Sequence, residues 1–334
     1  MFDNKRILVT GGTGSFGHAF VEMTLKNFNP EEVIVFSRDE MKQWNMAKLW
    51  HDDKRVRFVI GDVRDHDALR FIFRDVDYVV HAAATKIVPT AEYNPLECVK
   101  TNIDGAKNVI DAALFTGVKG VVALSTDKAS NPINLYGATK LVSDKLFVAA
   151  NKIQPLDQTR LSVVRYGNVM GSRGSVIPYF LDLVESGATE LPITDARMSR
   201  FMITLDDAVR LVWHAFADMV GGEIYVKKIP SMNIIEIAKS LAPSATHKIV
   251  GIREGEKIHE QMIGKEDAAN TFEYEDHFKI LPAINKFSAD PNRIKHGQRV
   301  DTDFVYESSS NPHWMTSEEL RSWVSQNRSK IGLI

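Results

Sequence analysis

The side chains best suited to acid–base chemistry lie in one short stretch of the sequence: Thr126, Asp127, Lys128, Tyr136 and Lys140. A Val-rich run just before Thr126 predicts a buried parallel strand, and the Asn-Pro pair after Lys128 prevents a helix from starting at once. A helix that begins near residue 134 would place Tyr136 and Lys140 one turn apart on the same face. We therefore expect the strand end and the helix to bring these side chains to one crevice.

Tyr136 and Lys140 suit the deprotonation of a hydroxyl group. A phenol has a pKa of about 10 and is a poor base at neutral pH. A fixed cation such as Lys140, together with an oxidised nicotinamide ring, would favour the phenolate and lower that pKa. Thr126 would hold the same substrate oxygen in place by a hydrogen bond. Alone, the Tyr-Lys spacing also fits a plain amphipathic helix and the Asp-Lys pair a surface ion pair, but their combination favours a catalytic role.

The composition is that of an ordinary globular enzyme. The 334 residues are 44% apolar and 25% charged, enough for one large α/β domain and a smaller lobe. Lys and Arg number 41 against 43 Asp and Glu, so no nucleic-acid or membrane partner is predicted. The single cysteine, Cys98, excludes an internal disulfide, and we predict no metal site. We see no signal-like or membrane-spanning apolar run and expect a cytoplasmic protein.

The N-terminal glycines predict a dinucleotide-binding turn. A buried-type strand, Arg6 to Thr10, runs directly into Gly-Gly-Thr-Gly-Ser-Phe-Gly at residues 11–17. Glycines in such a motif allow a tight turn and the close approach of a diphosphate, which then lies on the N-terminus of the following helix. We predict cofactor contacts from Gly11, Thr13, Gly14, Ser15, Phe16 and Gly17.

The tip of the second strand, Glu32 to Phe36, favours NADP over NAD. NAD sites usually place an acidic residue at this tip, where it binds the ribose hydroxyls. Here the tip reads Ser37-Arg38, with Lys42 one helical turn beyond. A hydroxyl and two cations suit the 2′-phosphate of NADP. Asp39, the next residue, keeps NAD open as the alternative.

Later strand ends supply the remaining cofactor contacts that we predict. The strand 56–60 ends near the place expected for the adenine, and the strand 78–81 leads into small residues that can pass beneath the ribose and nicotinamide. A long helix then follows from about Pro95 to Phe115. The expected contacts are Asp62, Val63, Ala82, Ala83, Ala84, Lys86 and Val169. We expect Tyr136 and Lys140 to contact the cofactor as well.

The alternation of strands and helices predicts a doubly wound parallel sheet of the Rossmann type, followed by a smaller C-terminal α/β lobe that binds substrate. We place the cofactor domain at residues 1–170 and the lobe mainly at 171–334, with the chain free to cross back between them. The loop after the strand 160–165 and two Arg-containing turns are candidate substrate contacts. Together with Lys86 these are Asn168, Arg173, Arg200 and Arg253.

The combination of the glycine motif, Ser125-Thr126 and Tyr136-x-x-x-Lys140 resembles the extended short-chain dehydrogenase/reductase superfamily, which modifies nucleotide sugars. Over its whole length the chain is similar to the inverting UDP-N-acetylglucosamine 4,6-dehydratases of pseudaminic acid biosynthesis, through STDKA at 125–129, NPINLYGATK at 131–140, RYGNVMGSRGSVIP at 165–178 and GIREGEK at 251–257. The Asp127-Lys128 pair is the most specific part. Retaining 4,6-dehydratases typically carry Asp-Glu at these positions, and 4-epimerases carry small residues.

This resemblance implies a lyase that uses tightly bound NADP. Tyr136 would take the proton of the sugar 4-hydroxyl as hydride leaves C4, Lys128 would take the C5 proton, Asp127 would protonate the leaving 6-hydroxyl, and hydride would return to C6. The base role of Lys128 would need a lowered pKa, by burial or by cations such as Lys140. The resemblance also implies UDP-N-acetylglucosamine as substrate and a homo-oligomer, either a hexamer or a dimer. A retaining dehydratase, a UDP-sugar 4-epimerase and a non-catalytic NADP-sensing protein remain the alternatives.

Overall fold

The main body of the protein is a ten-stranded sheet with helices on both faces. The computed structural model describes residues 1–152, 158–284 and 289–332. Its parallel strands are β1 (Arg6–Thr10), β2 (Glu32–Ser37), β3 (Val56–Ile60), β4 (Tyr78–His81), β5 (Gly120–Thr126), β6 (Arg160–Tyr166) and β10 (Ile224–Lys227). The strands β14 (Thr271–Glu273), β15 (His277–Ile280) and β16 (Gln298–Arg299) extend it antiparallel, giving the order β16-β14-β15-β10-β6-β5-β4-β1-β2-β3. The predicted Rossmann-type sheet is confirmed.

The central strands form because they are short, continuous apolar runs that can be covered on both faces. Ile7, Leu8 and Val9 of β1 are fully buried, as are the Val residues in the middle of β4 and β5. The register pairs Thr10 of β1 with Phe36 of β2 and with His81 of β4. The carboxyl ends of these strands therefore share one edge of the sheet.

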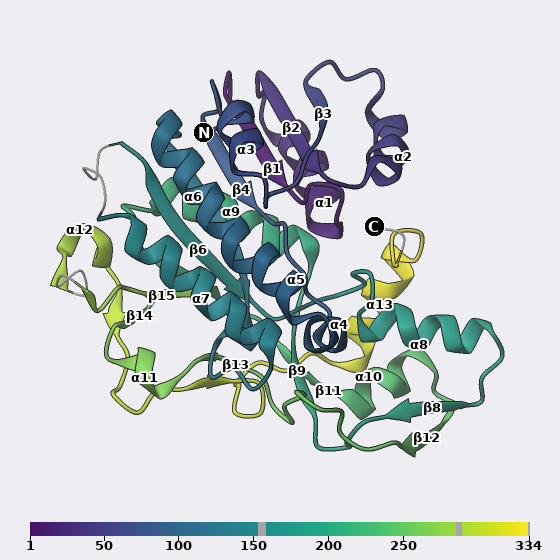
Figure 1. The fold of residues 1–334 in the computed structure, drawn as a ribbon. Coiled ribbons are helices and arrows are strands. Elements are labelled where there is room, and N and C mark those ends of the chain that lie inside the picture. Colours follow the sequence, from purple (N-terminus) through teal and green to yellow (C-terminus); the bar gives the residue numbers. More distant parts are fainter. Residues whose placement is uncertain (153–157, 285–288, 333–334) are drawn as a thin grey trace.

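Helices flank the sheet in two layers. On one side α1 (Ser15–Asn27) packs against α9 (Leu205–Asp218), which also contacts β5 and β6. On the other, α3 (His66–Ile72), α6 (Gly105–Thr116) and α7 (Leu135–Ala150) pack against one another, and α6 and α7 cross the front of the sheet in Figure 1. The remaining helix of this region, α2 (Glu40–Trp50), connects β2 to β3. Among the described residues, the helices are too short or too polar to cross a bilayer.

The long helix expected from about Pro95 to Phe115 is confirmed, but it contains a π-helical turn in its middle. The chain forms α4 (Val88–Tyr93), α5 (Pro95–Val99), a π-helical turn (Lys100–Asp104) and then α6. The wider turn buries Asn102, whose side chain accepts a hydrogen bond from Thr85 N at 2.8 Å and donates to Thr85 O at 3.0 Å. The irregularity thus fixes the loop that follows β4, a frequent use of π turns near functional sites.

A second, smaller lobe lies at the lower right of Figure 1. It combines the sheet β11-β9-β7, the strand pair β12-β8 and three helices around a separate apolar core. Its elements are β7 (Asn168–Val169), α8 (Val176–Glu185), β8 (Glu190–Ile193), β9 (Ser199–Ile203), β11 (Ser231–Asn233), α10 (Ile234–Leu241), β12 (Thr246–Ile249) and α13 (Ser317–Asn327). Because α9, β10 and β14 to β16 belong to the main body, the chain passes between the two parts more than once after residue 170.

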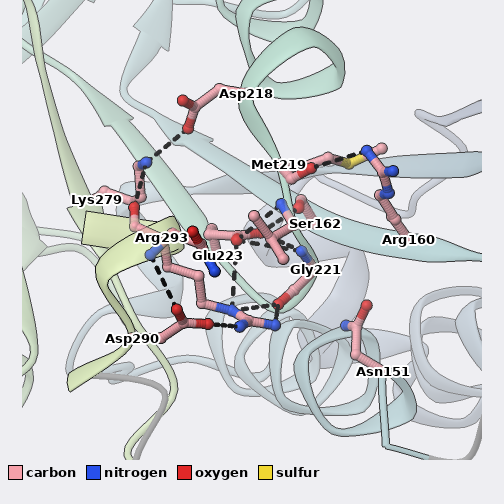
Figure 2. Close-up of polar contacts among 12 residues, drawn as sticks. Asn151, Arg160, Ser162, Asp218, Met219, Gly221, Glu223, Lys279, Asp290 and Arg293 are labelled. Carbon is pink, nitrogen blue, oxygen red and sulfur yellow. Dashed lines mark hydrogen bonds and ion pairs between the residues drawn. The ribbon is translucent and has the colours of Figure 1, made fainter. Parts of the chain in front are cut away.

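A buried ion network attaches the last part of the main body to the sheet (Figure 2). Arg293, on the short helix α12 (Pro291–Ile294), is 1% exposed and donates to the carbonyl oxygen of Gly221 at 3.1 and 3.2 Å. Its Nε lies 3.6 Å from Oε1 of the equally buried Glu223, and its Nη1 pairs with Asp290. Nearby, Lys279 Nζ pairs with Asp218 at 2.6 Å and donates to the Arg293 carbonyl at 2.9 Å. This network lies at the amino end of β6 and β10, away from the edge where the central strands end.

Replacing Arg293 with Met should destabilise the protein. The substitution keeps much of the side-chain volume but leaves the buried Glu223 carboxylate, and the partly buried Asp290, without their cation. Removing one partner of a buried ion pair typically costs about 3–5 kcal/mol. Urea unfolding followed by tryptophan fluorescence measures the loss. Arg210→Met on the exposed face of α9 is the matched control, because its side chain is 58% exposed and its removal should change stability by less than about 0.5 kcal/mol. Equal midpoints for the two variants would contradict a structural role for Arg293.

Candidate active site

A cavity of about 1170 Å³ follows the carboxyl edge of the sheet and is bounded by both parts of the protein. Of the predicted cofactor contacts, it is lined by Gly11, Thr13, Gly14, Ser15, Phe16, Ser37, Arg38, Lys42, Asp62, Val63, Ala82, Ala83, Ala84, Lys86, Tyr136, Lys140 and Val169. It is also lined by the predicted catalytic residues Thr126, Asp127 and Lys128 and by the predicted substrate contacts Asn168, Arg173, Arg200 and Arg253. The structure therefore brings these residues to one cavity.

The glycine turn after β1 is shaped for a close approach of backbone to ligand. Gly11 has a φ of +66°, and a Cβ there would lie 2.7 Å from Ala83 N. The helix α1 begins at Ser15 without a side-chain cap, so the N–H groups of its first turn suit an anion. Gly17 does not line the cavity: a Cβ there would lie 2.0 Å from Gly12 O. The cofactor contact predicted for Gly17 is therefore corrected: Gly17 instead allows α1 to pack closely on the turn.

The tip of β2 presents a hydroxyl and cations rather than a carboxylate. Ser37 Oγ lies 2.9 Å from Thr13 Oγ1. Asp39 caps α2 by accepting from Lys42 N at 3.0 Å, and its other oxygen lies 3.2 Å from Lys42 Nζ. Arg38 is 62% exposed at the cavity rim. Asp39, the acidic residue that could have bound a ribose, therefore already pairs with the first turn of α2.

Asp62 is also engaged within the protein. Its Oδ2 accepts from Arg64 Nε at 2.9 Å and from Arg64 Nη2 at 2.6 Å, and its Oδ1 accepts from Arg64 N. Burial alone would raise the pKa of Asp62, but Arg64 and Arg38 hold it below the usual value. An adenine amine at this position would share a carboxylate that is already ionised and hydrogen-bonded.

The predicted substrate contacts Lys86, Arg173, Arg200 and Arg253 line the part of the cavity next to the second lobe. Lys86 Nζ donates to the carbonyl of Arg173 at 3.2 Å, and burial together with Arg173 lowers the pKa of Lys86. Arg253 is 61% exposed on the cavity rim, 3.9 Å from Glu256. Arg200 differs, because it donates to the backbone carbonyls of Ser199, Lys257 and Ile258. Arg200 lines the cavity, and two of its hydrogen bonds hold the backbone of the 257–258 segment.

A tight turn and a helix cap position the catalytic candidates. The end of β5 passes into a 3-10 turn, Asp127–Ala129, and Asn134 caps α7 by accepting from Gly137 N at 2.7 Å. A Cβ at Gly137 would lie 2.1 Å from Lys128 O, so the first turn of α7 packs directly on the catalytic turn. This contact brings Tyr136 beside Thr126, Asp127 and Lys128, as predicted.

Asp127 and Lys128 form an acid–base pair in which the carboxylate is buried and the lysine side chain is 24% exposed to the cavity. Asp127 Oδ1 accepts from Thr126 Oγ1 at 2.8 Å and from Lys128 Nζ at 3.1 Å, and the Asp127 side chain is 1% exposed. Burial, reinforced by the carboxylate of Glu260, raises the pKa of Asp127. A raised pKa is what a carboxylic acid needs in order to donate a proton near neutral pH.

The pKa values of two catalytic candidates differ from the sequence-based expectation. Burial raises the pKa of Tyr136 to about 12, and the cation that partly opposes it is Lys128 rather than Lys140. Burial would lower the pKa of Lys128, but the carboxylates of Asp127 and Glu260 outweigh it and raise that pKa. The lowered pKa that a base role of Lys128 would need is therefore not found in this structure, since two carboxylates surround the ammonium group. Burial does lower the pKa of Lys140.

Glu260 is the residue of the site that the sequence did not reveal. Its Oε1 lies 3.2 Å from Lys128 Nζ, its side chain is 3% exposed, and it lines the cavity. It follows the Gly-Ile-Arg-Glu-Gly-Glu-Lys motif by a few residues and directly precedes β13 (Gln261–Ile263). A charged residue at the start of an apolar strand was the available signal. Among the described residues, no cluster of His, Cys, Asp or Glu could hold a metal ion.

Comparisons with known proteins agree with this site. A UDP-N-acetylglucosamine 4,6-dehydratase (inverting) from Campylobacter jejuni subsp. jejuni serotype O:2 is 55% identical over 96% of this chain and 97% of its own. A UDP-glucose 4-epimerase from Rickettsia canadensis is 43% identical over 84% of each chain.

Solved structures share the fold. The X-ray structure of Pen from Bacillus thuringiensis matches with a TM-score of 0.89 at 34% identity, over 98% of this chain and 99% of that one. DesIV, a dTDP-glucose 4,6-dehydratase from Streptomyces venezuelae solved with NAD bound, matches with a TM-score of 0.73 at 24% identity, over 98% of each chain. A family described as polysaccharide biosynthesis protein matches residues 7–282. Fold, cavity and sequence agree that this chain belongs to that family, with the inverting UDP-N-acetylglucosamine 4,6-dehydratases among its relatives.

Proposed function

We propose that this protein is a UDP-N-acetylglucosamine 4,6-dehydratase that inverts C5, a lyase with tightly bound NADP. The observation that carries this proposal is the pairing of Lys128 with the buried Asp127 at the end of β5, beside Tyr136 in the same cavity. Removal of water from C5 and C6 needs a base and an acid next to a transient ketone. The Campylobacter dehydratase, at 55% identity over nearly the whole chain, supports the same reaction.

The residues present fit a nicotinamide dinucleotide, and the β2 tip favours NADP. The Gly11 turn has no room for a side chain, and the first turn of α1 is uncapped, as a diphosphate site requires. Arg38, Lys42 and Ser37 would hold a 2′-phosphate, while Asp39 is engaged as the α2 cap. When bound, the nicotinamide supplies the hydride acceptor for C4 and the hydride donor for C6, and it is not consumed overall.

The protein's own residues carry the proton movements of the proposed reaction. Tyr136 takes the proton of the sugar 4-hydroxyl, with Thr126 fixing that oxygen by a hydrogen bond. The resulting ketone acidifies the C5 proton, which passes to Lys128. Asp127, whose pKa burial raises, protonates the departing 6-hydroxyl. Asn168, Arg173, Arg200 and Arg253 would hold the UDP-sugar, and Arg253 is the most exposed cation among them for the diphosphate.

The 4-epimerase alternative explains less of the site. Epimerisation at C4 needs the chemistry of Tyr136 and the nicotinamide, and it leaves the buried Asp127-Lys128 pair without a role. Burying an ion pair usually costs free energy, so a pair retained in a cavity calls for a functional explanation. The same argument weighs against a non-catalytic NADP-sensing protein. A retaining dehydratase is separated from the inverting one by the C5 configuration of its product.

We also propose the wider setting implied by the sequence resemblance. The enzyme would act in the cytoplasm as a homo-oligomer, either a hexamer or a dimer, and its product would enter pseudaminic acid-type sugar synthesis. Exposed apolar side chains on the short helices before α6, Tyr93 at 86% and Leu96 at 72% exposure, support contact between subunits. Sedimentation tests the oligomeric state, and the product assay below tests the reaction.

The purified protein should convert UDP-N-acetylglucosamine into UDP-2-acetamido-2,6-dideoxy-β-L-arabino-hexos-4-ulose. Proton NMR of the mixture should show a new C6 methyl group, and the same reaction in D2O should place deuterium at C5, because that proton is removed and replaced. The C5 configuration is read from the coupling constants. Formation of the C4 epimer with the 6-hydroxyl retained, or of the D-xylo product, would contradict the inverting dehydratase.

Lys128→Ala should lower the rate of dehydration by about 10²–10⁴-fold, the usual contribution of a general acid or base. NADP binding should be unchanged, because the predicted 2′-phosphate contacts lie at the β2 tip. Product formation by NMR and retained nucleotide after gel filtration provide the two measurements. Lys145→Ala, an exposed lysine on α7, is the control. A Lys128→Ala variant that forms product at the parental rate would remove Lys128 from the mechanism.

Arg38→Ala should weaken NADP binding by about 10–100-fold and leave NAD binding nearly unchanged. The reason is the loss of a charge-assisted hydrogen bond to the 2′-phosphate, worth roughly 1.5–3 kcal/mol. Calorimetric titration of the nucleotide-free protein with each cofactor measures the difference. Arg57→Ala on β3, whose guanidinium pairs with Glu32, serves as the control. Equal losses for NADP and NAD would show that the β2 tip does not recognise the 2′-phosphate.

A further inference from the structure

Glu260 is a third ionisable group beside the Asp127-Lys128 pair. Lys128 Nζ lies 3.1 Å from Asp127 Oδ1 and 3.2 Å from Glu260 Oε1, so one ammonium group lies between two carboxylates. Both carboxylate side chains are at most 3% exposed. Within the part of the chain that the structure describes, the other oxygen of each, Asp127 Oδ2 and Glu260 Oε2, is buried without a hydrogen-bond partner. Each of these oxygens could therefore carry a proton without losing a contact.

Hydrogen bonds on both sides of Glu260 hold its segment next to Lys128. Lys257 Nζ donates to Ser130 O at 2.7 Å, and Asn134 Nδ2 donates to Gly255 O at 2.7 Å. Both contacts tie the segment before Glu260 to the turn and helix cap that carry the catalytic residues. Behind it, Glu260 N donates to Ser308 Oγ at 3.0 Å. The position of Glu260 against Lys128 is thus set from both sides.

The neighbouring charges shift the pKa values of the two carboxyl groups in opposite directions. Glu260 faces Lys128, Arg200 at 3.9 Å and Lys257, whereas the buried Asp127 faces Lys128, Lys257, Tyr136 and Glu260 itself. Burial alone would raise the pKa of Glu260, but these cations hold it below its usual value, while burial and Glu260 raise the pKa of Asp127. Carboxyl groups whose environments push their pKa values apart divide acid and base roles between them. Here Glu260 is the more acidic member and Asp127 the less acidic one.

We propose that Glu260 is a positioning residue of the dehydration site, which keeps the acidic proton on Asp127 and accepts the proton of Lys128 so that the amine can act at C5. This inference rests on the proposed function. The acceptor is close, because Glu260 Oε1 lies 3.2 Å from Lys128 Nζ. The raised pKa of Lys128 and the lowered pKa of Glu260 oppose this transfer at rest, so in this scheme it takes place only during turnover.

Protons and net charge balance at each step of this scheme. At rest the site holds protonated Asp127, cationic Lys128 and anionic Glu260, with a net charge of zero. Transfer from Lys128 to Glu260 gives a neutral amine and a carboxylic acid. The amine then takes the C5 proton, the C6–O bond breaks as Asp127 protonates the leaving hydroxyl, and water departs. Asp127 is now anionic, Lys128 cationic and Glu260 neutral, so the buried site stays neutral throughout and avoids the cost of an unpaired buried charge.

Infrared difference spectroscopy of the full-length protein tests the resting proton without any substrate. Near neutral pH the parental protein should show the C=O band of a protonated carboxyl group, and Asp127→Asn should remove it. Glu260→Gln should leave less of this band at the same pH, because the anion that keeps the proton on Asp127 is gone. A parental spectrum without a protonated carboxyl assignable to Asp127 would overturn the proposal, whatever reaction the protein catalyses.

Kinetics test the role of Glu260 in turnover. Glu260→Gln should lower the dehydration rate by about 10²-fold or more, while oxidation at C4, followed by nicotinamide absorbance in a single turnover, stays near the parental rate. Dehydration needs protonated Asp127 and is lost as the pH rises through its pKa. Removing the Glu260 charge lowers the pKa of Asp127. The alkaline limb of the pH–rate profile for dehydration should therefore move to lower pH by roughly one unit. Glu260→Asp keeps the charge and should restore the position of the limb with a smaller rate loss.

Glu307→Gln is the matched control, because Glu307 lies on the neighbouring strand β17 (Tyr306–Glu307) and does not line the cavity. It should keep the parental rate and pH profile. A Glu260→Gln enzyme with the parental rate and alkaline limb, or one that also loses C4 oxidation, would overturn the proposal. A parental protein that forms no dehydrated product from UDP-N-acetylglucosamine would instead overturn the proposed function, and the infrared band would still decide where the resting proton lies.

Discussion

The structure depends on one electrostatic arrangement: a lysine ammonium held between two buried carboxylates on the wall of the cavity. Lys128 lies about equally far from Asp127 and Glu260, at 3.1 and 3.2 Å. In such surroundings a single unpaired charge is costly, so the three groups titrate together and the site favours a neutral total. The proton that remains on one carboxylate is then a consequence of burial rather than of any special property of aspartate. The chemistry of the site follows from this shared proton.

This arrangement requires both parts of the chain. Asp127 and Lys128 come from the end of β5, whereas Glu260 arrives on a segment that returns from the second lobe and is fastened by Lys257 and Asn134. Arg200, on β9 of the second lobe, holds the backbone of the same segment and adds a cation beside Glu260. The repeated crossing of the chain between the two parts is therefore what completes the site. A Rossmann domain that ended at β6 would have the pair without the group that balances it.

Much of the fold could be predicted from the sequence because buried parallel strands are simple to recognise. β1, β3 and β4 have the predicted bounds, since Val- and Ile-rich runs between turn residues have few other structures available. The π-helical turn in the expected long helix could not be predicted, because it depends on the contact of Asn102 with Thr85, which only the folded chain creates. Glu260 was missed for the same reason. Its place before the short apolar run of β13 does not reveal its partner, because Lys128 lies far away along the chain.

The same burial also bears on the first step of the proposed reaction. Tyr136 keeps its proton in this structure, because burial raises its pKa to about 12, and the nearby Lys128 cation does not overcome that. Lys140 is 3% exposed, and burial lowers its own pKa, so it is a weaker source of positive charge than its spacing from Tyr136 suggests. A reactive phenolate would then form only when further positive charge lies beside the ring, as an oxidised nicotinamide would provide. Burial therefore makes the base depend on the presence of the group that accepts the hydride, and it prevents proton abstraction from a sugar that cannot yet be oxidised.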